Sequence, residues 1–283
     1  MRAAVLGSPV GHSLSPVLHR AAYAALGLTG WEYEAIECDE GRLPGLVRSC
    51  GPDWAGLSLT MPLKEAVLPL LDTVEPVVTQ VAGANTIVFT GGSRHGFNTD
   101  VAGIAAALTE AGVSAAGPVV ILGAGATARA ALAAVHQLGA RAATVAVREP
   151  ARAAGMQAVA GRLGMTIGLR PFAEPAARSG YVLISTVPAG AADGYAERIS
   201  GAHPGPAAVL DVVYHPWPTR LARAAEQSGA IVIGGFEMLL HQAARQAELM
   251  TGRPAPTEAM RAAGRAELDR RAASRVPDGA GPG

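Results

Sequence analysis

The 283-residue chain has few cysteines, few aromatic residues and no excess of charge of either sign. Its two cysteines, Cys38 and Cys50, are too few for a disulfide scaffold and belong to no Cys/His cluster with metal-site spacing. We therefore expect two buried thiols and no metal. The 23 basic residues balance 23 acidic ones, and no basic stripe with interleaved aromatics occurs, which argues against a nucleic-acid partner.

Long apolar runs are also missing. No charge-free apolar run reaches the roughly 18 residues that a membrane-spanning helix needs, and the apolar stretch at the start of the chain is too short for a secretory signal. We therefore expect a soluble, cytoplasmic protein without a membrane partner.

Lysine and asparagine are scarce as well. Lys64 is the only lysine among the 23 basic residues, and Asn85 and Asn98 are the only asparagines. An arginine is always charged, whereas a lysine amine can release its proton. The single lysine is therefore either a surface residue retained by chance or a proton-transfer group, and its count alone does not separate the two.

Short apolar segments alternate with helical patterns along the chain, which predicts an α/β fold with two domains. The first third predicts an α/β unit whose first helix starts near Pro16. From about residue 117, strands separated by long helical segments predict a doubly wound parallel sheet of the Rossmann type. The expected strands are 2–7, 31–38, 54–60 and 85–90, then 118–122, 143–147, 181–186, 207–214 and 230–235.

Further helical patterns follow Gly235. We expect residues 1–105 to form the first domain. Residues 106–234 would form a nucleotide-binding domain, and the Gly- and Pro-rich residues 274–283 a disordered tail.

The segment ILGAGATARA, residues 121–130, fits the pattern GxGxxA between a predicted strand and a predicted helix. Gly123 allows the tight turn, Gly125 lets the backbone approach a pyrophosphate, and the small Ala128 lets the helix pack on the strand. The backbone N–H groups that begin the helix would face the phosphates. The alternative is a tight strand-to-helix turn without a ligand.

The residues after the next strand distinguish NAD from NADP. An acidic residue there would bind the ribose 2′-hydroxyl of NAD, whereas an arginine accommodates a 2′-phosphate. Arg148 and Arg152 favour NADP, and Glu149 would oppose it if its side chain pointed inward. The alternative for both arginines is a solvated loop.

Four polar clusters of the first third follow strands or precede helices, where α/β folds place ligands. Ser13 and Ser15 stand just before a helix, where their hydroxyls and the helix N-terminus could hold a carboxylate. Ser15 alone could equally be an ordinary N-cap. The clusters are residues 11–16, 58–65, 83–86 and 96–100.

Lys64 is expected in the first turn of a helix that Pro62 begins. The positive end of that helix and partial burial would both favour the neutral amine. Asp100 opens another helix and is the candidate partner of Lys64. The pair could exchange a proton with a substrate hydroxyl while a hydride moves to or from nicotinamide, or it could be a structural salt bridge.

Taken together and in this order, these motifs resemble those of the shikimate dehydrogenase family, from Val5 to about Leu249. They are SLSP, the T-x-P-x-K of TMPLK, GANT, NTD, GAGATA, the D-x-x-Y-x-P of DVVYHP and the G-x-x-M-L-x-x-Q of GFEMLLHQ. The resemblance implies a substrate-binding catalytic domain, residues 1–105 completed by residues 235–273, with an inserted NADP-binding Rossmann domain and an active site in the cleft between them. It also implies NADPH-dependent reduction of 3-dehydroshikimate to shikimate in aromatic amino-acid biosynthesis.

Matching positions carry the family's roles onto this chain. Lys64 would be the acid/base, paired with Asp100. The family's Asn-Arg-Thr at the cofactor site is here Val147, Arg148 and Glu149, which leaves open how strictly NADP is preferred over NAD. The implied substrate contacts are Ser13, Ser15, Thr60, Lys64, Asn85, Asp100, Tyr214 and Gln242, and the implied cofactor contacts are Gly123, Ala124, Gly125, Ala126, Thr127, Arg148, Arg152 and Gly235.

Other functions fit parts of the pattern. A quinate or aminoshikimate dehydrogenase would use the same scaffold, although Ser15 argues against quinate, with which we associate a threonine at that position. A methylenetetrahydrofolate dehydrogenase would also use a lysine but gives no reason for the paired serines. A non-catalytic NADP-binding module gives no reason for a Lys64–Asp100 pair. We expect a monomer or a homodimer.

Overall fold

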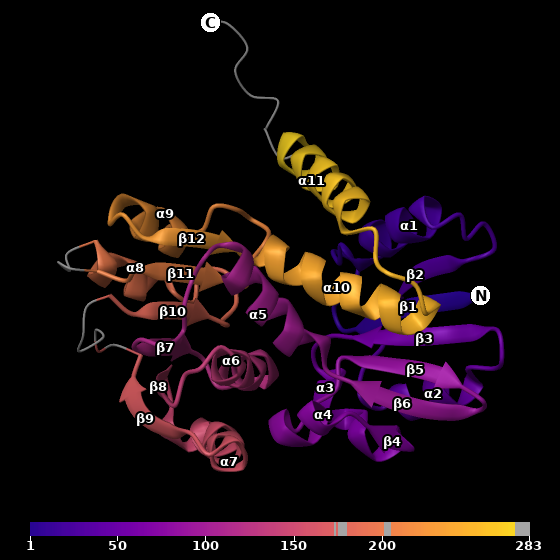
Figure 1. The fold of residues 1–283 in the computed structure, drawn as a ribbon, viewed down its shortest axis with the longest axis horizontal. Helices are drawn as coiled ribbons and strands as arrows, with labels where there is room; N and C mark the ends of the chain where they lie inside the picture. Colours follow the sequence, from indigo (N-terminus) through magenta and orange to yellow (C-terminus); the bar gives the residue numbers. More distant parts are fainter. Residues whose placement is uncertain (173, 175–179, 201–204, 275–283) are drawn as a thin grey trace, which may run out of the picture.

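The structure, a computed structural model, describes residues 1–172, 174, 180–200 and 205–274, apart from the side chains of Pro150 and Arg152. Two six-stranded sheets lie on either side of helices α5 (Thr99–Glu110) and α10 (Gly235–Thr251) (Figure 1). The predicted two-part α/β fold is thereby confirmed. Beyond Ser274, the expected disordered tail lies outside the described residues.

The first sheet combines parallel and antiparallel pairs in the order β2-β1-β3-β5-β6-β4. β1 is parallel to β2 and β3, whereas β5 is antiparallel to both β3 and β6. Its strands are β1 (Arg2–Gly7), β2 (Glu32–Glu37), β3 (Trp54–Leu59), β4 (Thr73–Val74), β5 (Thr86–Thr90) and β6 (Ser93–Phe97), and its helices before α5 are α1 (Ser15–Ala25), α2 (Leu43–Ser49), α3 (Leu63–Ala66) and α4 (Pro76–Val81), with a 3₁₀ turn at Leu68–Leu70.

The hairpin between β5 and β6 was not predicted from the sequence. Its two-residue turn is Gly91–Gly92, with φ of +60° and +81°. A turn with positive φ at both central residues suits the twist of a hairpin, and glycine adopts that conformation without strain. The hairpin brings Asn98, which follows β6, back beside the segment before β5, where its Nδ2 donates to the carbonyl oxygen of Gly83 over 2.8 Å.

The second sheet is parallel throughout, in the order β12-β11-β10-β7-β8-β9. This is the Rossmann order, in which ligands bind where the strand order reverses, here between β7 and β10. Its strands are β7 (Val119–Leu122), β8 (Ala142–Val147), β9 (Thr166–Pro171), β10 (Val182–Ser185), β11 (Ala208–Asp211) and β12 (Ile231–Gly234), and its helices are α6 (Ala126–Gln137), α7 (Ala154–Leu163), α8 (Asp193–Ile199) and α9 (Arg220–Gln227), with a 3₁₀ turn at Pro150–Ala153. Of these strands, β9 was not predicted.

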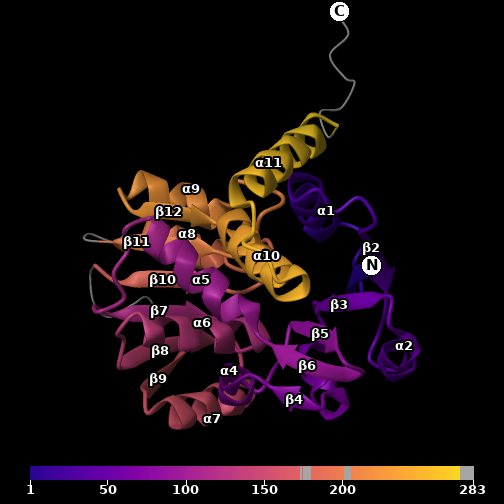
Figure 2. The same ribbon diagram turned by 45° about the vertical axis from the view of Figure 1, so that its right-hand side comes forward.

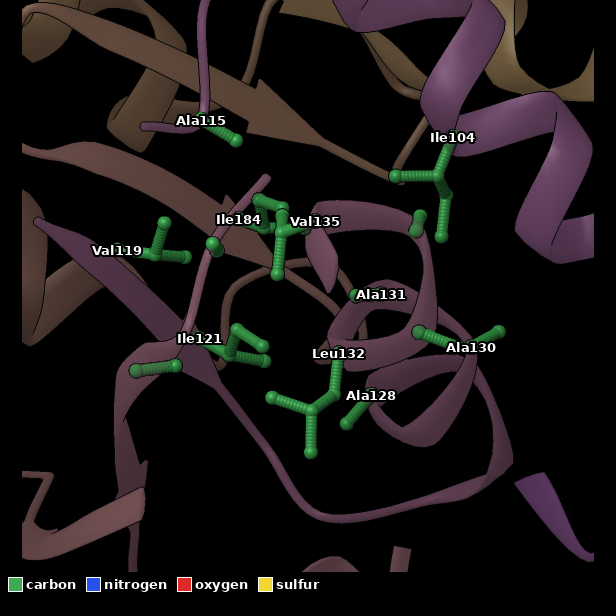
Figure 3. Packing of buried hydrophobic residues seen from close by; sticks show 14 of the residues in the cluster. Ile104, Ala115, Val119, Ile121, Ala128, Ala130, Ala131, Leu132, Val135 and Ile184 are labelled. Carbon is green, nitrogen blue, oxygen red and sulfur yellow. The ribbon is translucent and has the colours of Figure 1, made fainter. Parts of the chain in front are cut away.

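Small side chains pack α6 against the second sheet (Figure 3). Ala128, Ala131 and Leu132 are fully buried in one apolar cluster with Ile121 of β7. Alanines let the helix axis approach the sheet closely, as Ala128 was expected to do. The phosphate loop at the start of α6 is therefore held by a rigid core.

Helices α5 and α10 cross in close contact between the two sheets in both ribbon views (Figures 1 and 2). A Cβ atom at Gly103 of α5 would lie 2.8 Å from the carbonyl oxygen of Met238 and 2.9 Å from Cβ of Gln242, both on α10. A larger residue would push the helices apart. The crossing brings Asp100 of α5 near Gln242.

The end of the chain packs against its beginning. Helix α11 (Thr257–Ala273) lies beside α1 (Figure 2), and Leu240, Ala243 and Met260 share an apolar cluster with Val5 and Leu18. This packing supports our proposal that the end of the chain completes the first domain. None of the described helices is long and apolar enough to cross a membrane.

Two details differ from the expectations. The proposed limit between residues 105 and 106 falls inside α5, and the second sheet starts only at Val119. Cys38 is buried as expected, but Cys50 is half-buried, and both are free thiols.

Candidate active site

A cavity of about 290 Å³ lies between the two sheets, beside the start of α6. Its wall combines the loop after β1, the segment after β3, the start of α5 and one face of α10. Segments distant in sequence thus converge on one cavity, whose wall carries both polar and apolar side chains. The predicted site residues on its wall are Ser13, Ser15, Thr60, Lys64, Asp100, Thr127, Tyr214, Gly235 and Gln242.

Lys64 and Asp100 form an ion pair on this wall. Nζ of Lys64 donates a hydrogen bond to Oδ2 of Asp100 over 2.6 Å, and the two side chains are 14% and 6% exposed. Asp100 lies in the first turn of the twelve-residue α5, whose dipole stabilises a carboxylate. The predicted pairing of the two residues is present.

The helix that carries Lys64 is short. Lys64 does lie in the first turn of a helix, but α3 has only four residues, so few peptide dipoles align behind the amine. Nζ is instead hydrogen-bonded to the carboxylate of Asp100.

Asn85 lies behind the wall and is 1% exposed. Its Nδ2 donates to Oδ1 of Asp100 over 2.9 Å and to Oε1 of Gln242 over 3.2 Å. Its Oδ1 accepts from the backbone N–H of Thr99 over 2.8 Å and from the hydroxyl of Thr86 over 2.9 Å. Asn85 therefore orients two cavity residues from behind. The direct substrate contact that the resemblance implies for Asn85 stays a prediction.

Ser13 and Ser15 lie on the cavity wall at the start of α1. Ser15 is not the N-cap, because the cap position is Leu14 and Ser15 is the first helical residue. Instead, the Ser13 hydroxyl accepts a hydrogen bond from the backbone N–H of Ser15 over 3.2 Å. Both hydroxyls remain beside the N-terminus of an eleven-residue helix, a setting suited to an anion.

The phosphate loop, Gly123–Thr127, joins β7 to α6. Gly123 has a φ of +108°, and a Cβ there would lie 2.7 Å from Oγ1 of Thr186. A Cβ at Gly125, the N-cap of α6, would meet nothing within 4 Å. The loop thus has the tight turn and the open helix N-terminus that were expected, and Thr127 extends it to the cavity.

Arg148 and Glu149 are both exposed directly after β8. The side chain of Arg152 lies outside the described residues, so the assignment of both arginines to a 2′-phosphate stays a prediction. Tyr214 and Gly235 line the cavity near α10. A Cβ at Gly235 would lie 2.0 Å from the carbonyl oxygen of Val212, so this glycine also has a packing role.

Two further polar residues on the cavity wall, Ser58 and Gln246, were not assigned from the sequence. The Tyr33 hydroxyl donates to Oγ of Ser58 over 2.7 Å, and Ser58 donates to Oε1 of Gln246 over 2.8 Å. The same Oε1 lies 3.2 Å from Nε2 of His19. Gln246 follows Gln242 by one helical turn, and that spacing was the available sequence signal.

His19 is fully buried, and burial lowers the pKa of its imidazole to about 4 from its ordinary value of 6.5. Between pH 6.5 and about pH 4, His19 takes up a proton in the unfolded chain but not in the folded one. The free energy of unfolding should therefore fall as the pH falls through this range. Between pH 7 and pH 5, chemical denaturation should show a loss about 2 kcal/mol larger in the wild type than in His19→Phe, which keeps an aromatic ring. An equal loss of stability in the wild type and in His19→Phe would contradict a lowered pKa of His19.

Outside the cavity, ligand-type atoms of Glu110, Glu237 and His241 lie within 4.8 Å of one another. Arg261 pairs with both carboxylates, and Nε2 of His241 lies 2.6 Å from Oε2 of Glu110. The guanidinium group occupies the place that a cation would take. This cluster is an ion-pair network that joins α5, α10 and α11.

A Rossmann-type sheet whose phosphate loop adjoins a polar cavity with a lysine–aspartate pair is typical of two-domain oxidoreductases that use a nicotinamide nucleotide. The family model described as the shikimate dehydrogenase substrate binding domain matches residues 5–87, and that of the shikimate 5′-dehydrogenase C-terminal domain matches residues 235–263.

Comparisons with known proteins over nearly the full length of the chain point to the same family as the two family models. The NADP(+) shikimate dehydrogenase of Halobacterium salinarum is 39% identical over 267 residues, which cover 93% of this chain and 98% of that protein. The crystal structure of Mycobacterium tuberculosis shikimate dehydrogenase is 44% identical, with a TM-score of 0.85 and coverage of 94% and 99%. That of the Thermus thermophilus enzyme in complex with NADP(H) and shikimate is 35% identical, with a TM-score of 0.80 and the same coverage. The chain therefore belongs to the shikimate dehydrogenase family.

Proposed function

We propose that the protein is an NADP-dependent shikimate dehydrogenase, which reversibly reduces 3-dehydroshikimate to shikimate in aromatic amino-acid biosynthesis. The observation that carries the proposal is the Lys64–Asp100 pair, with 2.6 Å between Nζ and Oδ2, on a cavity that Thr127 of the phosphate loop also lines. Reduction of a carbonyl group requires a proton donor and a nucleotide at one place.

The residues around the phosphate loop fit NADP. The turn at Gly123 and the open space at Gly125 leave room for phosphates beside the N-terminus of the twelve-residue α6. Gly123–Thr127 would hold the pyrophosphate, and Arg148 and Arg152 the 2′-phosphate. NADP, when bound, supplies or takes up the hydride.

The protein's own side chains bind the substrate and move the proton. Lys64 donates a proton to the carbonyl oxygen during reduction and takes one from the hydroxyl during oxidation. Asp100 holds the amine in place. Ser13 and Ser15 bind the carboxylate beside the N-terminus of α1.

The ring hydroxyls of the substrate contact the other polar groups of the cavity wall. Thr60 and Gln242 lie on that wall with Tyr214, and each can donate and accept hydrogen bonds. Asn85 fixes the orientation of Asp100 and Gln242 from behind. Gly235 contacts ligand through its backbone.

A quinate or aminoshikimate dehydrogenase is the alternative on the same scaffold, since those substrates share the carboxylate and most of the ring. A non-catalytic NADP-binding module would leave the Lys64–Asp100 pair without a task. Initial rates of oxidation of shikimate, quinate and aminoshikimate, each with NADP⁺ and NAD⁺, distinguish these possibilities. We expect the highest kcat/KM for shikimate with NADP⁺. If the protein binds NADPH but oxidises none of the three substrates, the non-catalytic binding module is the correct function.

Replacing Arg148 by alanine should weaken NADPH binding about tenfold and NADH binding much less, because only NADPH carries the 2′-phosphate. Fluorescence titration of each reduced nucleotide measures both dissociation constants. Arg141→Ala is the matched control, since Arg141 is exposed at the opposite end of β8. Equal weakening of both nucleotides by Arg148→Ala would remove Arg148 from 2′-phosphate recognition.

The cellular setting follows from this function. A reaction that uses NADPH and a small polar acid suits the cytoplasm, and we propose that location. We also propose that the protein acts as a monomer or a homodimer.

A further inference from the structure

Arg129 is a buried arginine for which the sequence suggested no role. It lies in the first turns of α6, two residues after Thr127, and its side chain is 9% exposed. Its Nε is buried and has no hydrogen-bond partner within the described part of the chain. A Cβ at Gly155 of α7 would lie 3.2 Å from Nη1 of Arg129, so this glycine leaves room for the guanidinium group.

The position of Arg129 is electrostatically unfavourable by itself. The N-terminus of a helix carries partial positive charge, which disfavours a cation nearby, and burial removes the water that would stabilise the charge. A carboxylate must therefore compensate it. The described partner is Glu65, whose Oε1 accepts a hydrogen bond from Nη2 of Arg129.

Glu65 belongs to the other half of the molecule. It lies on α3, beside the first sheet, and directly follows Lys64. The backbone carbonyl of Lys64 also accepts a hydrogen bond from the N–H of Ala84 over 2.8 Å. The short α3 is therefore attached to the segment before β5 at Ala84 and to the phosphate-loop helix at Arg129.

We propose that Glu65 and Arg129 are a positioning pair that holds the turn carrying Lys64 against the phosphate loop, so that the amine lies at the correct distance from a nucleotide bound there. Neither side chain takes part in proton transfer. The kinetic part of this proposal rests on the proposed function, because it concerns the proton that Lys64 moves.

The first test is Glu65→Gln, which removes the charge and keeps the size of the side chain. Glu65 is 60% exposed, but its replacement leaves the buried charge of Arg129 uncompensated, so we expect a folded variant of lower stability. Thermal unfolding shows whether the variant is folded under the assay conditions. A small misplacement of a reacting group is costly, so kcat for shikimate oxidation should fall about tenfold with both KM values nearly unchanged. Asp72→Asn is the matched control, because it breaks an ion pair with Arg94 on the first sheet, away from the cavity.

Reversal of the charges tests the pairing itself. Glu65→Arg alone places two guanidinium groups together and should lower kcat further. Combined with Arg129→Glu it restores an ion pair, and the double variant should recover most of the wild-type kcat. A double variant no better than Glu65→Arg would contradict a pairwise role.

The second test needs no turnover, because Lys64 is the only lysine in the chain. An amine-acylating reagent can modify only Lys64 and the N-terminal amine, which is far from the pair and serves as an internal reference. After proteolysis, mass spectrometry of the peptide with Lys64 and of the N-terminal peptide gives the ratio of the modification rates of the two amines. When the pair is broken, α3 should open more often, and the ratio for Lys64 should rise about threefold or more in Glu65→Gln.

The two tests separate the proposals. A wild-type protein that does not oxidise shikimate overturns the proposed function, while the acylation ratio still decides the positioning role. An unchanged ratio in Glu65→Gln, together with a kcat equal to that of the wild type, overturns the positioning pair whatever the substrate.

Discussion

Lys64→Ala should lower kcat for shikimate oxidation by about 10²- to 10⁴-fold, with little change in KM, because the variant loses the group that exchanges the substrate proton. The carboxylate of the substrate would still bind at Ser13 and Ser15, which explains the nearly constant KM. Steady-state rates with NADP⁺ at several shikimate concentrations measure both constants. An unchanged kcat would remove Lys64 from the mechanism.

Lys64→Arg separates the charge of Lys64 from its chemistry. A guanidinium group can still pair with Asp100, but it does not release its proton at working pH. We therefore expect kcat to stay near that of Lys64→Ala. Thermal unfolding of both variants should show an intact fold, and recovery of activity in Lys64→Arg would mean that positive charge alone suffices.

Gly235→Ala should lower the free energy of unfolding by about 3 kcal/mol, because overpacking against backbone atoms forces the chain apart. The new Cβ would lie 2.0 Å from the carbonyl oxygen of Val212, and a backbone atom cannot move aside as the end of a flexible side chain can. Gly235 begins α10, which also carries Gln242. Urea denaturation without any ligand measures the loss.

Gly161→Ala is the control for this substitution. Gly161 lies inside α7, and a Cβ there would meet no atom within 4 Å. Alanine favours a helix over glycine, so this variant should gain about 0.5 to 1 kcal/mol. If Gly235→Ala were as stable as the wild type, the packing role of Gly235 would be wrong.

The parts of the site that depend on local patterns could be predicted from the sequence. The phosphate loop follows from glycine spacing between a strand and a helix, and both halves of that context are local. The pairing of Lys64 with Asp100 needed more, because 36 residues separate them. It was found because the single lysine drew attention and the motifs around both residues resembled one family.

Other features depend on tertiary contacts that no local pattern encodes. Asn85 stands in a recognisable motif, yet only the packing of α5 and α10 places it behind the wall. Gln246 reaches the cavity because α10 crosses the first sheet. Glu65 and Arg129 are 64 residues apart, and no local pattern links their charges. The Gly91–Gly92 turn, in contrast, was a local hairpin signal that the sequence analysis did not use.

The packing of the end of the chain against its beginning has a consequence for synthesis on the ribosome. Leu18 of α1 cannot acquire its final neighbours until Leu240 and Met260 have been made, whereas one apolar cluster of the second sheet draws all its members from residues 120–232. Domains generally fold as units while the chain emerges. We therefore expect the nucleotide-binding half to reach its native state first, although it comes second in the chain, and the nascent N-terminal strands to wait for the last two helices.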